Sequence, residues 1–254
     1  MNILNHNKAL WGSYYAATLR LLGSTGTILP IGDPDFGKPD STTFTTVGEV
    51  QTTFTWSEAP SAFDTPLDLR SASSYKGIVP VINFNNSDEY ATSPDITYWS
   101  PLSAASSWGG WVNVSTTAGT AALFSKYIAA DNKEYIVYLS NNTAKPQINI
   151  YDESEASDPK VGTYATNAEI IVDTWQHFIW TWDGGTAGSG CNIYIDGSLM
   201  TTTDISEAGF VACENLGAKI NLGTADDTSK VSPMAGLIAG GPCGPFYTQK
   251  ELSA

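Results

Sequence analysis

The chain has 254 residues and a formal net charge of -14, with 26 Asp and Glu against 12 Lys and Arg. A field of that sign repels phosphate backbones, so we expect no nucleic-acid partner. We also expect no membrane span, because no window approaches the roughly 20 apolar residues that a spanning helix needs. The length suits one large all-β domain with an extension.

The first expected element is a helix over residues 8–22. Asn7 is suited to cap its start and Gly23 to end it. The segment lacks the uninterrupted apolar run of an export signal, so we expect synthesis and folding in a cytoplasm. The helix carries an apolar stripe that can dock on the main domain or on a partner chain. The residues expected to anchor or oligomerise the protein are Leu10, Trp11, Tyr14 and Leu21.

Residues 26–39 are rich in Gly, Pro and Asp and indicate a linker or arm. Residues 41–56 then alternate aromatic and Thr side chains, which predicts a half-buried strand or a hairpin broken near Gly48. The aromatic residues of this N-terminal part have no core of their own. Their burial requires another surface, which can be the main domain itself, a neighbouring subunit or a capsid.

From Gly77 onward, short strands follow one another, separated by Gly, Asn, Asp or Pro, with no long helix between them. This spacing is typical of sandwiches and barrels. The expected strands are GIVPVINF, SWGGWVNVS, AALFSKYI, EYIVYLS, PQINIY, AEIIVD, QHFIWTW, CNIYID, AKINLG and GLIAG.

Two of these strands, residues 176–182 and 191–196, alternate most clearly. Because successive side chains of a strand point to opposite faces, one set in each should face the core. Asp196-Gly197 then predicts a tight turn. The expected core residues are Phe178, Trp180 and Trp182 in the first strand and Cys191, Ile193 and Ile195 in the second.

An ordered set of segments resembles the laminin-G-like branch of the concanavalin A-like lectin/glucanase superfamily. The segments are VINFNNSDEYATSPD, SWGGWVNVS, ALFSKY, WQHFIWTWDGG, CNIYIDGSLM, INLGT and MAGLIAGGPCGPFYTQKELSA. The resemblance implies an all-β, concanavalin A-like jelly-roll sandwich of two antiparallel sheets over residues 77–254. Residues 1–76 are then an N-terminal extension of helix, arm and hairpin, with an anchoring or oligomerising role.

We expect no enzyme activity. Retaining glucanases of this superfamily place three acids at alternating positions of one strand. The one dense acidic run, YDESEASD, offers Glu153 and Glu155 but has Ser157 at the third position, and its turn-forming neighbours predict a solvated loop. His177 is a structural position in the resemblance, and His6 lies in the expected arm. No nucleophile elbow or phosphate loop is present.

Calcium is the one cofactor that the resemblance suggests. Members of the family often bind Ca²⁺ through the loop after the opening strand, where this chain has Asp88, Glu89 and Asp95 as oxygen ligands. The closing strand departs from the family pattern, because Gly240 stands about where an Asp is usual. The alternative is that these acids are solvated loop residues.

Aromatic side chains provide the candidates for a sugar site. Tyr98 and Trp99 lie in a loop and are the expected glycan-binding residues, because an exposed ring can stack on a sugar. Trp108 and Trp111 belong to a strand and are expected to pack in the core and at its edge.

The leading hypothesis is a non-enzymatic structural protein of a bacteriophage particle, such as a capsid decoration, head fibre or tail component. It rests on fold-level analogy. Its expected location is the virion surface after synthesis in the host cytoplasm, and its expected partners are capsid or tail subunits, further copies of itself and a host-surface glycan. The alternative is a carbohydrate-binding module that recognises a cell-surface glycan with or without calcium. A third alternative is an accessory domain of a hydrolase.

Overall fold

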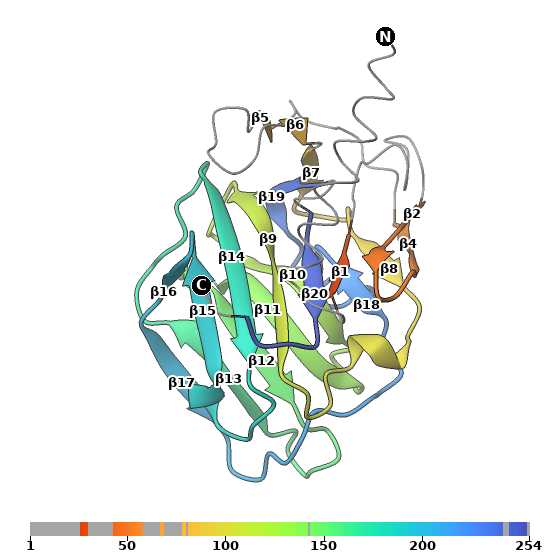
Figure 1. Ribbon diagram of the computed structural model, residues 1–254, viewed down its shortest axis with the longest axis vertical. Helices are drawn as coiled ribbons and strands as arrows, with labels where there is room; N and C mark the ends of the chain where they lie inside the picture. Colours follow the sequence, from red (N-terminus) through yellow and green to blue (C-terminus); the bar gives the residue numbers. More distant parts are fainter. Residues whose placement is uncertain are drawn as a thin grey trace.

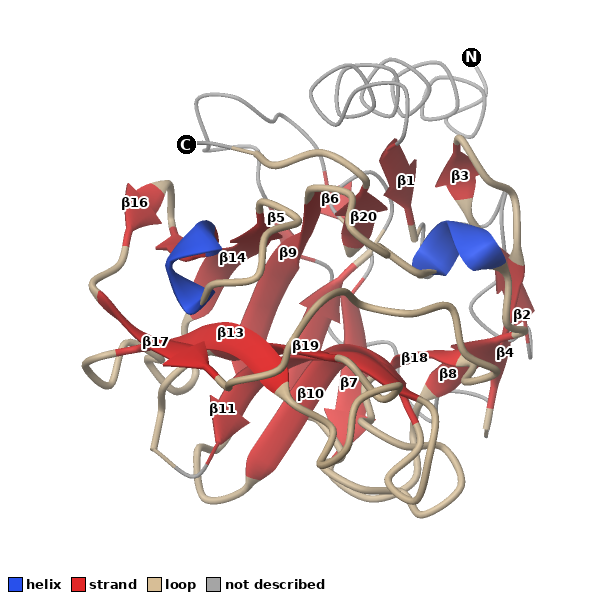
Figure 2. Ribbon diagram, turned by 90° about the horizontal axis from the view of Figure 1, so that it is seen from below, coloured by secondary structure: helices blue, strands red, loops and turns tan. Residues whose placement is uncertain are grey.

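The computed structural model describes residues 26–29, 43–57, 67–68, 78–79, 81–141, 143–240 and 244–252. Two antiparallel sheets of nine strands each, counted over these residues, pack face to face as two layers (Figure 1, Figure 2). This confirms the expected all-β sandwich. The expected helix over residues 8–22, with Leu10, Trp11, Tyr14 and Leu21, lies outside the described residues. Within the described part, no helix is long and apolar enough to cross a membrane.

The first sheet, here sheet A, has strand β9 (Ser106–Val114) near its centre. β9 pairs with three antiparallel partners, which are β14 (Trp175–Trp182), β19 (Ala235–Ala239) and β20 (Phe246–Thr248). The remaining strands extend the sheet from these. They are β1 (Gly26–Ile28), β3 (Val47–Gly48), β7 (Val81–Asn85), β15 (Cys191–Ile195) and β16 (Ser198–Leu199).

The second sheet, here sheet B, runs in the order β17-β13-β12-β11-β10-β18-β8-β4-β2. A separate two-stranded ladder joins β5 (Leu67–Asp68) to β6 (Ile78–Val79). The strands of sheet B are β17 (Thr202–Ser206), β13 (Lys160–Ala165), β12 (Gln147–Tyr151), β11 (Lys133–Asn141), β10 (Thr120–Tyr127), β18 (Ile220–Leu222), β8 (Ala91–Ser93), β4 (Thr53–Trp56) and β2 (Thr43–Thr45).

The strands before residue 77 complete both sheets. β1 pairs with β20 in sheet A, and β4 pairs with β8 at the edge of sheet B. Phe44 stacks on Phe54 with ring centroids 5.0 Å apart, and Phe54 meets the edge of Trp99 at 5.9 Å. The sandwich itself therefore buries these aromatics, and β1, β2, β3 and β4 of the expected extension over residues 1–76 belong to the sandwich.

The expected hairpin near Gly48 is confirmed, and the glycine is required there. Gly48 adopts a φ of 136°, which favours glycine. A Cβ atom at this position would lie 2.2 Å from the carbonyl oxygen of Gly26 in the adjacent strand. The close approach of β3 to β1 therefore depends on the missing side chain.

The tryptophan-rich strand β14 forms the core as expected. Phe178, Trp180 and Trp182 are fully buried, and Phe178 stacks on Trp180 at 5.4 Å. Cys191, Ile193 and Ile195 of the paired strand β15 are buried beside them. The predicted turn follows, with φ values of 51° at Asp196 and 80° at Gly197. The alternation read from the sequence is therefore correct in both strands.

One expected strand, AEIIVD at residues 168–173, is wrong. These residues form a loop, in which the amides of Glu169 and Ile170 both donate to the carbonyl oxygen of Ala144. The Gln176 side chain accepts a hydrogen bond of 2.8 Å from the amide of Ile171, where a neighbouring strand would otherwise supply a backbone carbonyl. Hydrophobic composition alone suggested a strand, but side-chain and single-carbonyl hydrogen bonds satisfy this backbone instead.

Candidate functional site

The expected sugar platform at Tyr98 and Trp99 is not exposed. Both residues lie in the short 3₁₀ turn η1 (Thr97–Trp99), and Trp99 is fully buried between Phe54 and Tyr247. The Tyr98 hydroxyl donates to Thr27 Oγ1 at 2.7 Å. Trp99 belongs to the sandwich core and the half-buried Tyr98 packs against it, so the expectation that Trp99 offers an exposed stacking surface is wrong.

The three expected calcium ligands have separate partners. Glu89 is buried and accepts the amide of Asn85 at 2.8 Å, and Asp88 accepts the side-chain amide of Asn85 at 2.9 Å. Asp95 forms an ion pair of 2.8 Å with Lys126. Among the described residues, no three His, Cys, Asp or Glu side chains are grouped so that they could hold a metal ion.

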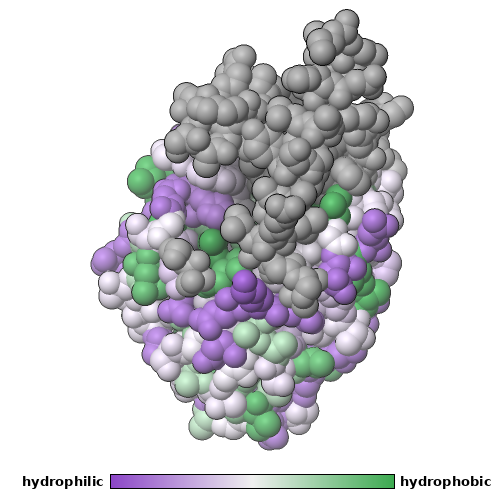
Figure 3. All heavy atoms as spheres, viewed as in Figure 1, coloured by the Kyte–Doolittle hydropathy of each residue, from purple (hydrophilic) through white to green (hydrophobic). Residues whose placement is uncertain are grey.

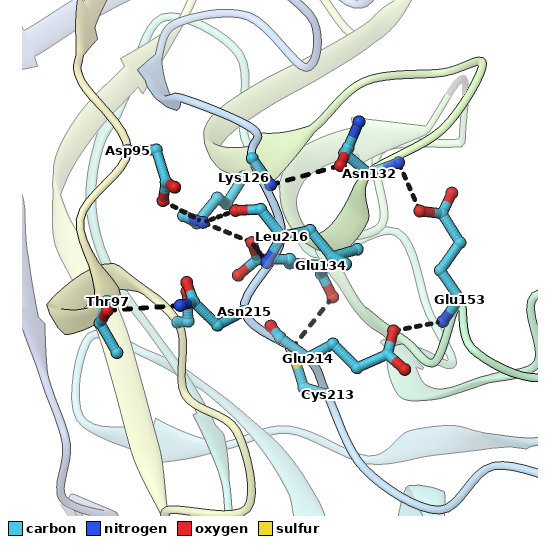
Figure 4. Close-up of polar contacts among 12 residues, drawn as sticks. Asp95, Thr97, Lys126, Asn132, Glu134, Glu153, Cys213, Glu214, Asn215 and Leu216 are labelled. Atoms are coloured by element: carbon cyan, nitrogen blue, oxygen red, sulfur yellow. Dashed lines mark hydrogen bonds and ion pairs between the residues drawn. The ribbon is translucent and has the colours of Figure 1, made fainter.

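Asp95 instead belongs to a buried ionic cluster (Figure 4). The Lys126 ammonium contacts Glu134 Oε1, Asp95 Oδ1 and the carbonyl oxygen of Leu216. Burial raises the pKa of Glu134 to about 7, although the Lys126 charge lowers it. A carboxyl group with this pKa is suited to proton transfer. Here it is fully enclosed, so the cluster is a structural feature of the sandwich.

The acidic run after β12 is the loop that the sequence predicted. It leaves β12 at Asp152 and returns to β13 at Lys160, with positive φ values at Ser157 and Asp158. Glu153 pairs with Lys133 at 3.5 Å. The run therefore does not present carboxylates at alternating positions of one strand.

The outer side of sheet A offers a mixed surface. On the side seen in Figure 3, hydrophobic and hydrophilic residues of the described part are interspersed. The strands of sheet A lie in front in the same view of Figure 1. Among the residues described on this side, the figure shows no single apolar patch.

Four tyrosines line the outer side of sheet B, and we call this surface the tyrosine face. Alternation directs Ile148 and Ile150 of β12 into the core and Tyr151 outward. Tyr127 and Tyr151 lie 5.6 Å apart between ring centroids. The four half-buried residues of the face are Tyr127, Tyr138, Tyr151 and Tyr164, from β10, β11, β12 and β13.

The register of the strands places amides between these rings. Gln147 lies opposite both Tyr138 and Tyr164. Its side-chain amide donates to Asn149 Oδ1 at 2.8 Å, and Asn149 donates in turn to the Tyr151 hydroxyl at 3.4 Å. A continuous row of hydrogen-bonding groups therefore runs along β12 between flanking rings.

A glycine is required where β13 approaches β12. Gly162 lies opposite Asn149 on one side and Ile205 on the other. A Cβ atom at Gly162 would meet the carbonyl oxygen of Ile148 at 2.0 Å. The close approach of the two strands beside Asn149 therefore depends on the missing side chain.

Beside Tyr164, one end of the tyrosine face has a cavity of about 250 Å³. The Lys145 ammonium lies over the Tyr164 ring, 5.6 Å from its centroid, which is a cation–π arrangement. The cavity is lined by Thr143, Lys145, Gln147, Tyr164 and Ile205.

The opposite end of the tyrosine face is covered by residues 224–231. The Ser125 hydroxyl of β10 donates to the carbonyl oxygens of Thr224 and Ala225. Asp226 is buried and accepts the amide of Ala129 at 2.9 Å. The segment therefore covers the outer side of sheet B at β10 and β18, and its Ala225 also packs in one buried cluster with Ile136 of β11.

The hydroxyls of Tyr127, Tyr138 and Tyr151 remain protonated near neutral pH. Burial raises the pKa of Tyr138 to about 12, and it raises the pKa values of Tyr127 and Tyr151 as well. A neutral phenol both donates and accepts a hydrogen bond. The tyrosine face thus combines aromatic surface with paired donors and acceptors, which is a combination suited to a polyhydroxylated ligand.

Residues 85–240 match the family described as the concanavalin A-like lectin/glucanases superfamily. The chain belongs to this superfamily. The match confirms the fold that the ordered sequence segments suggested. A search of curated proteins found no match to the sequence.

Several solved structures share the superfamily fold with this chain. The botulinum neurotoxin serotype D binding domain has 11% identity and a TM-score of 0.55, covering 94% of this chain and 50% of that one. The binding domain of Paraclostridial Mosquitocidal Protein 1 has 12% identity and a TM-score of 0.55, covering 91% and 49%. The binding domain of botulinum neurotoxin DC in complex with SialylT has 10% identity and a TM-score of 0.53, covering 92% and 50%. The protein described here thus spans about half the length of these binding domains.

The sequence contained a signal for the tyrosine face, and our reading of it was incomplete. The segments EYIVYLS, PQINIY and VGTYA each carry a Tyr that adjoins at least one apolar residue, which is Val137 or Leu139, Ile150 and Ala165 in turn. In this superfamily fold, those neighbours face the core, which leaves each Tyr outside. Tyr135 shows why the assignment is difficult, because it is fully buried in the same strand that exposes Tyr138.

Proposed function

We propose that this protein binds carbohydrate on the tyrosine face of sheet B. The observation that carries the proposal is the row of linked amides at Gln147 and Asn149 between half-buried tyrosine rings. Binding sites for small molecules combine apolar and aromatic walls with a few placed polar groups. A sugar ring presents the complementary surface, with C–H groups on its faces and hydroxyls around its edge.

The geometry favours an extended glycan over a compact ligand. Away from the covered strand β10, the tyrosine face crosses three neighbouring strands, from Tyr138 to Tyr164, and adjacent strands lie about 4.8 Å apart. The cavity beside Tyr164 has a volume suited to one sugar residue. We expect the neighbouring sugar residues to lie along β12 beside it.

The test is glycan binding by the full chain, measured on a glycan array and then by calorimetry. Tyr164→Ala should weaken the affinity for a bound glycan by roughly tenfold or more, which corresponds to about 1.4 kcal/mol. Asn149→Ala should weaken it to a similar extent. The matched control is Tyr194→Ala, because Tyr194 is equally half-buried but belongs to β15 of sheet A. The proposal would be refuted if all three variants lost glycan affinity equally, or if none of them lost it.

The proposed setting for this binding domain is the surface of a virus particle, with capsid or tail subunits and further copies of the chain as neighbours. This part of the proposal rests on fold-level analogy alone. Mass spectrometry of purified particles from an infected culture is its test. Absence of the chain from particles that contain all their other structural proteins would leave glycan binding as the whole of the function.

A further inference from the structure

Lys145 differs from the other lysines of sheet B in having no carboxylate partner among the described residues. Lys133 lies 2.6 Å from Asp158, and Lys160 lies 3.0 Å from Glu207. Lys126 is held by Glu134 and Asp95. Lys145 has a tyrosine ring beneath its ammonium instead.

An unneutralised cation in a cavity is notable in this chain. The protein has 26 acidic residues against 12 basic ones, so carboxylates outnumber the lysines and arginines with which they can pair. Lys145 is half-buried at the wall of the cavity, so its position is defined by the surface around it. Its charge remains available to a ligand.

The groups beside Lys145 would hold a ligand by hydrogen bonds. Thr143 supplies a hydroxyl, Gln147 an amide and Tyr164 a phenol to the same cavity. Pockets for drug-sized ligands begin at about 300 Å³. This cavity of about 250 Å³ therefore fits a single sugar residue with one charged substituent.

We propose that this cavity selects a sugar residue that carries an anionic group, with Lys145 as the residue that determines the preference. The inference rests on the proposed carbohydrate binding and specifies its ligand class. A lysine ammonium is a compact point charge, so a carboxylate and a sulfate are both suitable partners. The net negative charge of the rest of the protein makes this local cation the main source of attraction for such a ligand.

The experiment compares three matched oligosaccharides that differ at one terminal residue, which is glucose, glucuronic acid or 6-sulfated glucose. Binding of each to the full chain is measured by calorimetry at low and at 0.5 M salt. We expect at least a tenfold preference for one or both charged forms at low salt. The preference should shrink at high salt, because salt screens the attraction. The two charged arms identify whether carboxylate or sulfate is the preferred group.

Lys145→Gln should abolish the preference, because it should lower the affinity for the charged oligosaccharides about tenfold more than it lowers the affinity for the neutral one. The matched control is Lys160→Gln, because Lys160 also lies over a tyrosine of the same face, 5.9 Å from the Tyr151 centroid, but is already paired with Glu207. It should retain the preference. Binding of all three oligosaccharides with equal affinity, or a preference that survives Lys145→Gln, would overturn this inference alone. Failure of every glycan to bind would overturn the proposed function with it.

Discussion

Lys126 and Glu134 face each other at one end of the sandwich, and both side chains are fully buried. A register shift between β10 and β11 produces this contact. Lys126 lies opposite Tyr135 and Tyr127 lies opposite Lys133, so Glu134 is an extra residue in its strand. Such a bulge redirects a side chain, and here it turns the carboxylate toward the ammonium. The pair is further held by the amide and carbonyl groups of Leu216.

Removal of the lysine should be costly. In Lys126→Met, the Glu134 carboxylate loses its buried counter-ion, so we expect the free energy of unfolding to fall by about 3–5 kcal/mol. Urea denaturation at pH 7.5 measures this. The double variant Lys126→Met with Glu134→Leu removes both charges and should recover most of the loss. A single variant as stable as the unaltered protein would contradict the structural role of the pair.

The pH dependence of stability should contain a contribution from Glu134. Its folded pKa of about 7 lies above the ordinary value of 4.5, so the folded state holds the proton more tightly than the unfolded state. This contribution is complete below pH 4.5 and is lost as the pH rises to about 7. Glu134→Gln should abolish it, which melting temperatures across this range will show. An identical pH profile in the variant would refute the assignment.

His177 should change the stability of the fold with pH in the direction opposite to that of Glu134. Its ring lies 5.1 Å from Trp111 and 6.4 Å from Phe246, and burial lowers its pKa from 6.5 to about 4, against the attraction of Asp196. The folded state therefore disfavours the charged ring, and stability is lost as the pH falls from 6.5 to 4. His177→Gln should flatten this loss. In Glu134→Gln, by contrast, the loss should become steeper, because the opposing contribution is absent.

Two core tryptophans differ in the partner of the indole N–H. Trp182 Nε1 donates to the carbonyl oxygen of Gly185 at 3.0 Å, whereas Trp180 Nε1 has no hydrogen-bond partner in the described part of the chain. Replacement by Phe removes a similar volume from each fully buried site. Trp182→Phe should therefore cost about 1 kcal/mol more than Trp180→Phe, since it also loses a hydrogen bond. Chemical denaturation of the two variants side by side measures the difference, and equal costs would contradict it.

The sequence was sufficient to predict the sandwich and its core strand. Alternation is unambiguous in β14, because Trp180 and Trp182 share a face with Phe178 and the intervening residues are less apolar. It was less informative near the N-terminus. Short strands such as Gly26–Ile28 carry too few residues for a period to show, and they form because a partner strand from elsewhere in the chain is adjacent.

The candidate site was predicted less well, and burial explains why. Trp99 comes from a stretch of turn-forming residues and was expected to be exposed, yet the packing of η1 against Tyr247 encloses it. The tyrosine face depends on strand register, which fixes whether Gln147 lies opposite Tyr164 or one residue away. Local patterns do not contain that information, because it is set by turns and bulges between strands.

The pairing of β1 with β20 has a consequence for how the protein is made. Gly26–Ile28 leaves the ribosome long before β20, and β3 can pair with one of its edges soon afterwards. Its other edge has no partner until Phe246–Thr248 has been translated. Between these two times, a nascent chain carries an unpaired strand edge, which is a site where neighbouring chains on one messenger can pair wrongly. Slower translation would prolong this exposed state rather than protect against it.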